Sequence, residues 1–148
     1  MSEAVLTPYL GVHDCAAAID FYRRAFGAEE TGPRFTATDG RVGHAEIAIG
    51  GCQVFISDEY PEVGALSPKR LGGSHAALHL RVADVDGAAR RLVEAGATVL
   101  HAVADQADGE RRGTFLDPFG YRWMIGQLVE TPSKEQMQER IGDGFRVD

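Results

Sequence analysis

The sequence has few cysteines, no basic cluster and no long apolar run, and each absence excludes a class of protein. Its two cysteines, Cys15 and Cys52, cannot build a disulfide framework. Acidic residues outnumber basic ones by 22 to 15, and the net charge of −7 argues against nucleic acid or an anionic membrane as a partner. Nothing approaches the roughly 18 apolar residues of a membrane span, and the first residues show no leader pattern. We therefore expect a cytoplasmic protein.

What the chain does contain is enough apolar sequence for one folded domain. It has 148 residues, of which 44% are hydrophobic and 25% are charged, as is usual in globular proteins. Its 18 glycines indicate many tight turns. This composition predicts a single domain over residues 1–148.

An internal repeat divides this domain. The segment 10–18 (LGVHDCAAA) matches the segment 80–88 (LRVADVDGA) at Leu, Val, Asp and Ala, 70 positions apart. Each match is followed by a helix-periodic run, a glycine and strand-like residues. We predict two modules, each with the order strand, helix and three strands, at residues 5–58 and 76–129. The loop between them, residues 59–75, is long enough to be a lid or binding loop, or it is a flexible linker.

Local signals place the elements of each module. Asp14 and Gly27 suit the start and the end of the first helix, and Asp84 or Asp86 and then Gly96 do so for the second. The tail at 130–148 is polar and carries a short capped helix. Strands are expected at 5–12, 29–36, 43–49 and 52–57 in the first module, and at 78–82, 98–103, 113–116 and 121–129 in the second.

The glycine pair at 50–51 predicts the register of one hairpin. Ile49 then pairs with Cys52 and Glu46 with Phe55, and cross-strand partners share a face of the sheet. One face is apolar and should pack under a helix; it carries Ala45, Ile47, Ile49, Cys52, Val54 and Ile56. The opposite face carries His44, Glu46, Ala48, Gln53, Phe55 and Ser57. This second face is either solvated or the inner wall of a curved sheet that holds a ligand.

Several short motifs follow one another along residues 5–129. They are LTPYLGV at 6–12, AIDFY at 18–22, AFGA at 25–28, GHAE at 43–46, ISDE at 56–59, VADVD at 82–86, EAGAT at 94–98, and DPFG at 117–120 with Trp123. In this order the motifs resemble the vicinal oxygen chelate superfamily, which includes glyoxalase I, bleomycin-resistance proteins and extradiol dioxygenases, and in particular its PhnB-like branch. The resemblance implies an α+β fold in which two tandem βαβββ modules form a curled mixed sheet with a cleft. It also implies a homodimer.

The resemblance further assigns four positions to a divalent metal ion. In glyoxalase-type members one side chain from each of four strands holds the metal, and the matching positions here are Thr7, Phe55, Ala77 and Met124. Such ions prefer imidazole or carboxylate ligands, and none of the four positions supplies one. We therefore expect no metal and no other cofactor at these positions. An alternative metal site would use His44, Glu46 and His79.

Strand alternation places nine side chains in the expected cleft. They are Thr7, Tyr9, His44, Glu46, Phe55, Ser57, His79, Arg122 and Met124. The aromatic rings suit a planar ligand, and the charged groups could balance an ionic one.

The cleft composition predicts a metal-free small-molecule-binding protein, similar to antibiotic-binding, bleomycin-resistance-type members of the superfamily. The alternative is a glyoxalase/lyase-like or dioxygenase-like enzyme that uses a non-standard metal site, or Glu46 or His44 as a general base. A third reading is a structural or regulatory dimer whose cleft binds nothing.

Overall fold

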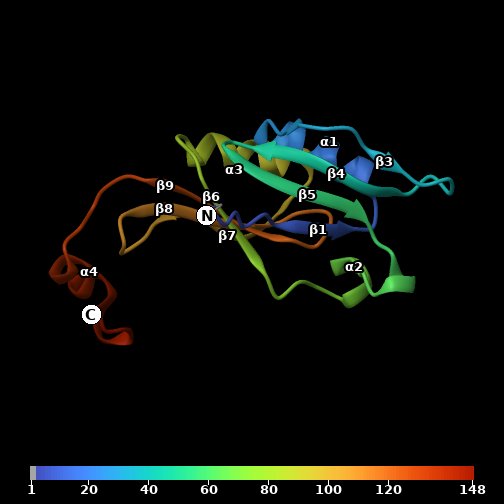
Figure 1. The fold of residues 1–148 in the computed structure, drawn as a ribbon. Helices are drawn as coiled ribbons and strands as arrows, with labels where there is room; N and C mark the ends of the chain where they lie inside the picture. Colours follow the sequence, from blue (N-terminus) through green and yellow to red (C-terminus); the bar gives the residue numbers. More distant parts are fainter. Residues whose placement is uncertain (1–2) are drawn as a thin grey trace.

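The computed structural model describes residues 3–148, which form an α+β fold with one mixed sheet in each module (Figure 1). The first module contains β1 (Tyr9–Val12), α1 (Cys15–Phe26), β2 (Glu29–Glu30), β3 (Phe35–Thr36), β4 (Val42–Ile49) and β5 (Cys52–Asp58). The second contains β6 (Ala77–Arg81), α3 (Val85–Ala95), β7 (Thr98–Asp105), β8 (Glu110–Leu116) and β9 (Arg122–Leu128).

The strand order is equivalent in the two sheets. The first runs β1-β5-β4-β2, with β3 also paired to β4, and the second runs β6-β9-β8-β7. In each sheet the first strand is parallel to the last strand of its module, whereas the remaining pairs are antiparallel. The predicted α+β fold of paired βαβββ modules is thus confirmed. The strand expected at 29–36 is interrupted and forms the two short strands β2 and β3.

The helix ends lie where the sequence signals place them. The carboxylate of Asp14 caps α1, and that of Asp84 caps α3, so Asp86 is not the cap. Each carboxylate accepts a hydrogen bond from a first-turn amide that has no partner within the helix. Gly27 and Gly96 end the helices in the left-handed conformation, with φ of 68° and 116°.

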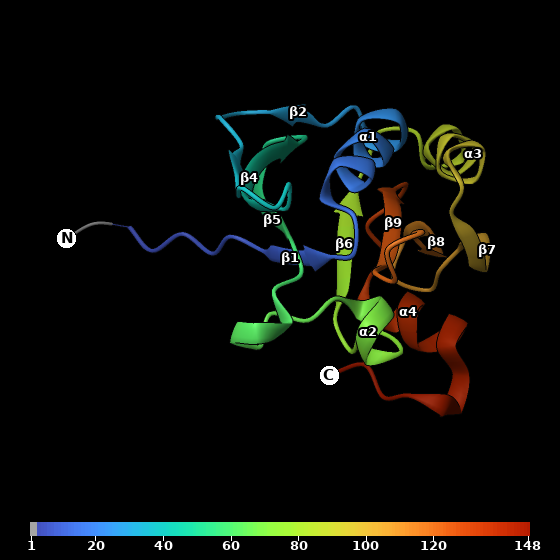
Figure 2. The same cartoon turned by 90° about the vertical axis from the view of Figure 1, so that its right-hand side faces the viewer.

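The two helices hold the modules together. Figure 2 shows α1 and α3 packed side by side, with the first sheet next to α1 and the second sheet below the two helices. The hairpin face predicted to be apolar is buried in a continuous core, except for Cys52, which is exposed where β5 begins. Leu92 of α3 is buried as its periodicity suggests, whereas Val93 is 49% exposed.

A buried carboxylate joins the modules at the DPFG turn. Asp117, only 3% exposed, accepts hydrogen bonds from the hydroxyl of Tyr22 in α1 and from the indole Nε1 of Trp123 at 2.9 Å. It also accepts from the amides of Phe119 and Tyr121, each at 2.9 Å. Burial, followed by the charge of Asp117, raises the pKa of Tyr22. All four donors therefore depend on one carboxylate.

The segment between the modules is folded rather than extended. Residues 59–75 include a 3₁₀ turn, η1 (Pro61–Val63), and the short helix α2 (Pro68–Leu71). Glu59 accepts from the amide of buried Ser67 at 3.0 Å and from the guanidinium of Arg70 at 2.7 Å. Hydrogen bonds from Arg70 and then Ser67 lower the pKa of Glu59 to about 2.

The tail forms α4 (Lys134–Ile141), followed by a second 3₁₀ turn, η2 (Gly142–Gly144). Ser133 and Gln136 cap α4 reciprocally, each side chain accepting from the other residue's amide. In Figure 1 this helix lies beyond the ends of β8 and β9. No helix within residues 3–148 has the length and apolar character needed to cross a membrane.

Candidate functional site

One face of the first sheet gathers aromatic side chains from four strands. Because Tyr9 and Glu46 both pair with Phe55 across the sheet, their side chains share its face, and His44 joins them by alternation. Ring centroids lie 5.7 Å apart for Tyr9 and Phe55, 5.0 Å for His44 and Phe55, and 6.1 Å for Phe35 and His44. We call Tyr9, Phe35, His44 and Phe55 the aromatic face. Sequence reasoning missed Phe35.

A chain of hydrogen bonds runs through the aromatic face. The hydroxyl oxygen of Tyr9 is 2.8 Å from His44 Nδ1, and His44 Nε2 is 3.2 Å from Glu46 Oε1. The amide of Gln53 donates to the other oxygen of Glu46 at 3.4 Å. An ionised carboxylate only accepts, so in neutral His44 the hydrogen sits on Nε2 and Nδ1 accepts from Tyr9. The order of donation is therefore Tyr9 to His44 to Glu46.

The aromatic face is open in the single chain. Tyr9 is 52% exposed and Phe35 is 63% exposed. Of the other side chains expected there, Thr7 precedes β1 and is half-buried, and Ser57 is buried in β5. In the single chain the aromatic face is therefore an open surface of the first sheet rather than an enclosed pocket.

The second sheet carries a separate charged cluster. His79 Nε2 lies 2.6 Å from Oε1 of Glu110, whose side chain is almost fully buried. Arg112 approaches the same oxygen at 3.3 Å, and Arg81 approaches the other at 3.5 Å. Burial acts to raise the pKa of Glu110, but hydrogen bonds from His79 and Arg112 outweigh it, and that pKa is lowered. The cluster braces β6 against β8.

Glu110 was missed because the strand was expected to begin at Gly113, whereas β8 begins at Glu110. The carboxylate passes over β9 at Gly126, where an added Cβ would lie 1.7 Å from Glu110 Oε1. A glycine inside a predicted strand is the signal that indicates such a close approach.

The strand registers show which of the predicted ligand-binding positions are equivalent in the two modules. Tyr9 pairs with Phe55 in the first sheet, and His79 pairs with Met124 in the second, each across a parallel strand pair. Phe55 and Met124 are therefore equivalent positions of the two modules. The same holds for Tyr9 and His79.

The positions that the family resemblance assigns to a metal ion do not fit one. Thr7 and Phe55 belong to the first module, and Ala77 and Met124 to the second. Together they offer a hydroxyl, a phenyl ring, a methyl group and a thioether, which do not make a ligand set for a divalent ion.

The alternative metal set is not assembled within one chain. His44 and Glu46 are neighbours on the first sheet, but His79 lies on the second sheet and pairs with Glu110. No group of three His, Cys, Asp or Glu side chains in the described part of the chain is placed to hold a metal ion.

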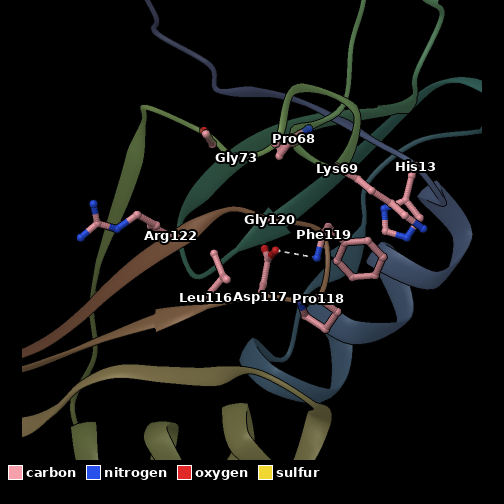
Figure 3. Close-up of a pocket in the computed structure, with 12 residues that line it drawn as sticks. His13, Pro68, Lys69, Gly73, Leu116, Asp117, Pro118, Phe119, Gly120 and Arg122 are labelled. Atoms are coloured by element: carbon pink, nitrogen blue, oxygen red, sulfur yellow. Dashed lines mark hydrogen bonds between the residues drawn. The ribbon is translucent and has the colours of Figure 1, made fainter.

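Arg122 lies apart from the aromatic face. It is exposed at one end of a pocket of about 490 Å³ between α2 and the turn at 117–120 (Figure 3). The structure thus brings together four of the nine predicted ligand-binding residues, Tyr9, His44, Glu46 and Phe55. His79 and Met124 lie on the other sheet.

Comparison with known proteins finds a matching family profile, related sequences and similar structures. The profile of the Glyoxalase/Bleomycin resistance protein/Dioxygenase superfamily matches residues 5–125. An uncharacterized protein of Mycobacterium bovis is 41% identical over 148 residues, covering 96% of this chain and 97% of its own. A gene product of Arabidopsis thaliana has a similar structure, with a TM-score of 0.65, 25% identity, and coverage of 84% of this chain and 98% of that one. A fosfomycin resistance protein of Listeria monocytogenes, solved with Mn(II), has a TM-score of 0.64 at 16% identity, covering 96% and 100%.

Proposed function

We propose that this chain, which belongs to the Glyoxalase/Bleomycin resistance protein/Dioxygenase superfamily, binds a small planar molecule on its aromatic face without a metal ion. The observation that carries the proposal is the set of aromatic rings on one sheet face, flanked by polar groups that are already hydrogen-bonded to one another. Binding sites for small molecules have this composition: apolar and aromatic walls with a few placed polar groups.

The rings suit a flat ligand. Tyr9 and Phe55 meet edge to face, at an interplanar angle of 76°, so a planar molecule can stack on one ring while contacting the edge of the other. Glu46 adds a carboxylate 3.2 Å from His44, which favours a ligand with a hydrogen-bond donor or a positive charge. Planar antibiotics are one class with these properties.

A second copy of the chain would supply the missing wall. Ligand sites usually bury most of the ligand surface, whereas Tyr9 is 52% exposed and Phe35 is 63% exposed. Exposed aromatic patches of this kind also mark protein interfaces. We therefore propose a homodimer that covers the aromatic face, to be measured by light scattering after size-exclusion chromatography.

A screen of planar compounds by thermal shift tests the binding proposal. A ligand present at 100 times its Kd stabilises the folded state by about 2.7 kcal/mol, which raises Tm measurably. The stabilisation should be lost in Phe55→Ala and retained in Phe145→Ala, a matched control that removes an exposed ring from the tail. Equal responses of the two variants would place the ligand elsewhere.

The absence of a suitable ligand set at the family positions supports the metal-free part of the proposal. Elemental analysis of the purified protein checks it. A stoichiometric metal ion that disappears in His44→Ala would contradict the proposal and would favour the metal-dependent alternative.

A second candidate function is metal-free acid–base catalysis on the same face. The observation that favours it is the chain from Tyr9 through His44 to Glu46. In such an arrangement a carboxylate orients the histidine, and the other ring nitrogen accepts a hydrogen bond from a hydroxyl. This arrangement activates the hydroxyl for proton transfer. In this role His44 takes the proton from Tyr9, and Glu46 stabilises the imidazolium that forms.

Nitrogen NMR of the His44 ring tests this second candidate. The hydrogen-bond chain from Tyr9 to Glu46 requires the ring hydrogen of His44 on Nε2. Glu46→Gln should weaken the preference of the hydrogen for Nε2, whereas Glu139→Gln in α4 should leave this preference unchanged. A ring that carries its hydrogen on Nδ1 in the unaltered protein cannot accept from Tyr9 and excludes the relay.

A further inference from the structure

The pocket beside Arg122 lies at the junction of the modules and shares no residue with the aromatic face. It has a volume of about 490 Å³ and is lined by α2, by the turn at 117–120 and by the residue that precedes the cap of α1 (Figure 3). Its walls come from both modules and from the segment between them. The place is therefore created only when the whole chain folds.

The walls of this junction pocket are largely apolar. Pro68 and Leu116 line it together with Pro118 and Phe119 of the turn. Phe119 is buried, and its ring lies 5.4 Å from the imidazole of His13 at an interplanar angle of 33°. The accessible part of this wall is exposed Pro118 and half-buried Leu116, and a flat apolar group can lie there.

Two cationic side chains of the pocket have no ion-pair partner in the described part of the chain. Lys69 and Arg122 line the pocket, and neither has a carboxylate partner within residues 3–148. In Figure 3 the Lys69 side chain extends toward His13, while Arg122 lies at the opposite end. The one carboxylate at the pocket, Asp117, is already satisfied by four donors.

His13 adds an unused hydrogen-bonding group. Its Nδ1 is buried and has no partner among the residues that the structure describes. Buried polar atoms in folded proteins nearly always have a partner, so such an exception points to a missing one. If the imidazole turned toward Lys69, this N–H would donate to a carboxylate oxygen that also pairs with the ammonium group.

We propose that the junction pocket binds a small aromatic carboxylate, with its ring against Leu116 and Pro118 and its carboxylate between Lys69 and His13. This site goes beyond the proposed function, because a ligand there needs neither the aromatic face nor a second copy of the chain. Dissolved salt screens the attraction between the ligand carboxylate and Lys69, so the affinity for the ligand should fall as ionic strength rises.

Titration with benzoate, followed by amide NMR, tests the proposal on the full chain. Gly72, Gly73 and Gly120 line the pocket and report binding there, whereas Gly43 lies beside the aromatic face. Saturable shifts at the three pocket glycines are expected with benzoate, and much smaller ones with benzamide, its neutral counterpart. Shifts centred on Gly43, equal shifts with the two compounds, or no saturable shift would overturn the proposal.

Two variants make the test specific to the charge. Lys69→Gln should weaken benzoate binding about fivefold, which corresponds to the upper range for an exposed ion pair. Lys134→Gln removes the chain's other lysine, in α4, and should leave the affinity unchanged. Both lysines are exposed, so both variants should fold, and equal affinities of the two variants would overturn the proposal.

Discussion

Replacing Asp117 with alanine should weaken the packing of the two modules against each other and lower the free energy of unfolding. Four donors lose their acceptor at once: the Tyr22 hydroxyl, the Trp123 indole and the amides of Phe119 and Tyr121. Each buried donor left without a partner costs about 1–3 kcal/mol, although the two turn amides can reach other acceptors. We therefore expect Asp117→Ala to lower the free energy of unfolding by about 3–5 kcal/mol. That corresponds to a fall in Tm of about 10 °C for a chain of this length.

Urea unfolding followed by far-UV circular dichroism measures this loss, and the fluorescence of Trp123, the chain's single tryptophan, reports its local environment. Tyr22→Phe is the matched control, because it removes one donor and leaves the carboxylate with three. It should cost about 1–2 kcal/mol. If Asp117→Ala destabilised the protein no more than Tyr22→Phe does, the carboxylate would not be the common acceptor described above.

Three further predictions concern other parts of the fold. Gly126→Ala should lower the free energy of unfolding by about 1–3 kcal/mol, because its Cβ would collide with Glu110; denaturant unfolding measures the loss, and an unchanged midpoint would refute the close approach. A thiol reagent should modify exposed Cys52 but not Cys15 in the folded protein, because burial and then nearby Asp58 raise the Cys15 pKa to about 12; labelling of both at equal rates would refute this. Because the pKa of Glu59 is lowered from 4.5 to about 2, its contribution to stability is complete above pH 4.5 and is lost as the pH falls toward 2. Hydrogen-exchange protection factors in residues 59–75, which are corrected for the intrinsic exchange rate at each pH, should therefore fall over that range. They should no longer do so in Glu59→Gln.

Sequence reasoning succeeded where the determinants are local. A helix cap such as Asp14 acts within one turn, and the glycine pair at 50–51 sets a hairpin register through neighbours on the same two strands. The pairing of Glu46 with Phe55 followed from that register, and so did the place of His44 and Phe55 on one face of the sheet.

The sequence could not predict groups that meet only through tertiary packing. Glu110 reaches His79 across β9, a contact that depends on where β8 begins and on the space left at Gly126. Arg122 shares the strand face of Met124 but lies at a pocket that α2 helps to build, and α2 belongs to a segment expected to be a loop. Alternation gives the face of a sheet, but it does not say which other elements approach that face.

A crystal structure with a compound selected by thermal shift would show whether the aromatic face holds a planar ligand. We expect the compound to be stacked on Tyr9 or Phe55, within hydrogen-bonding distance of His44 or Glu46, with a second copy of the chain closing over it. A compound bound elsewhere, while the aromatic face remains open to solvent, would show that this face is not the ligand site.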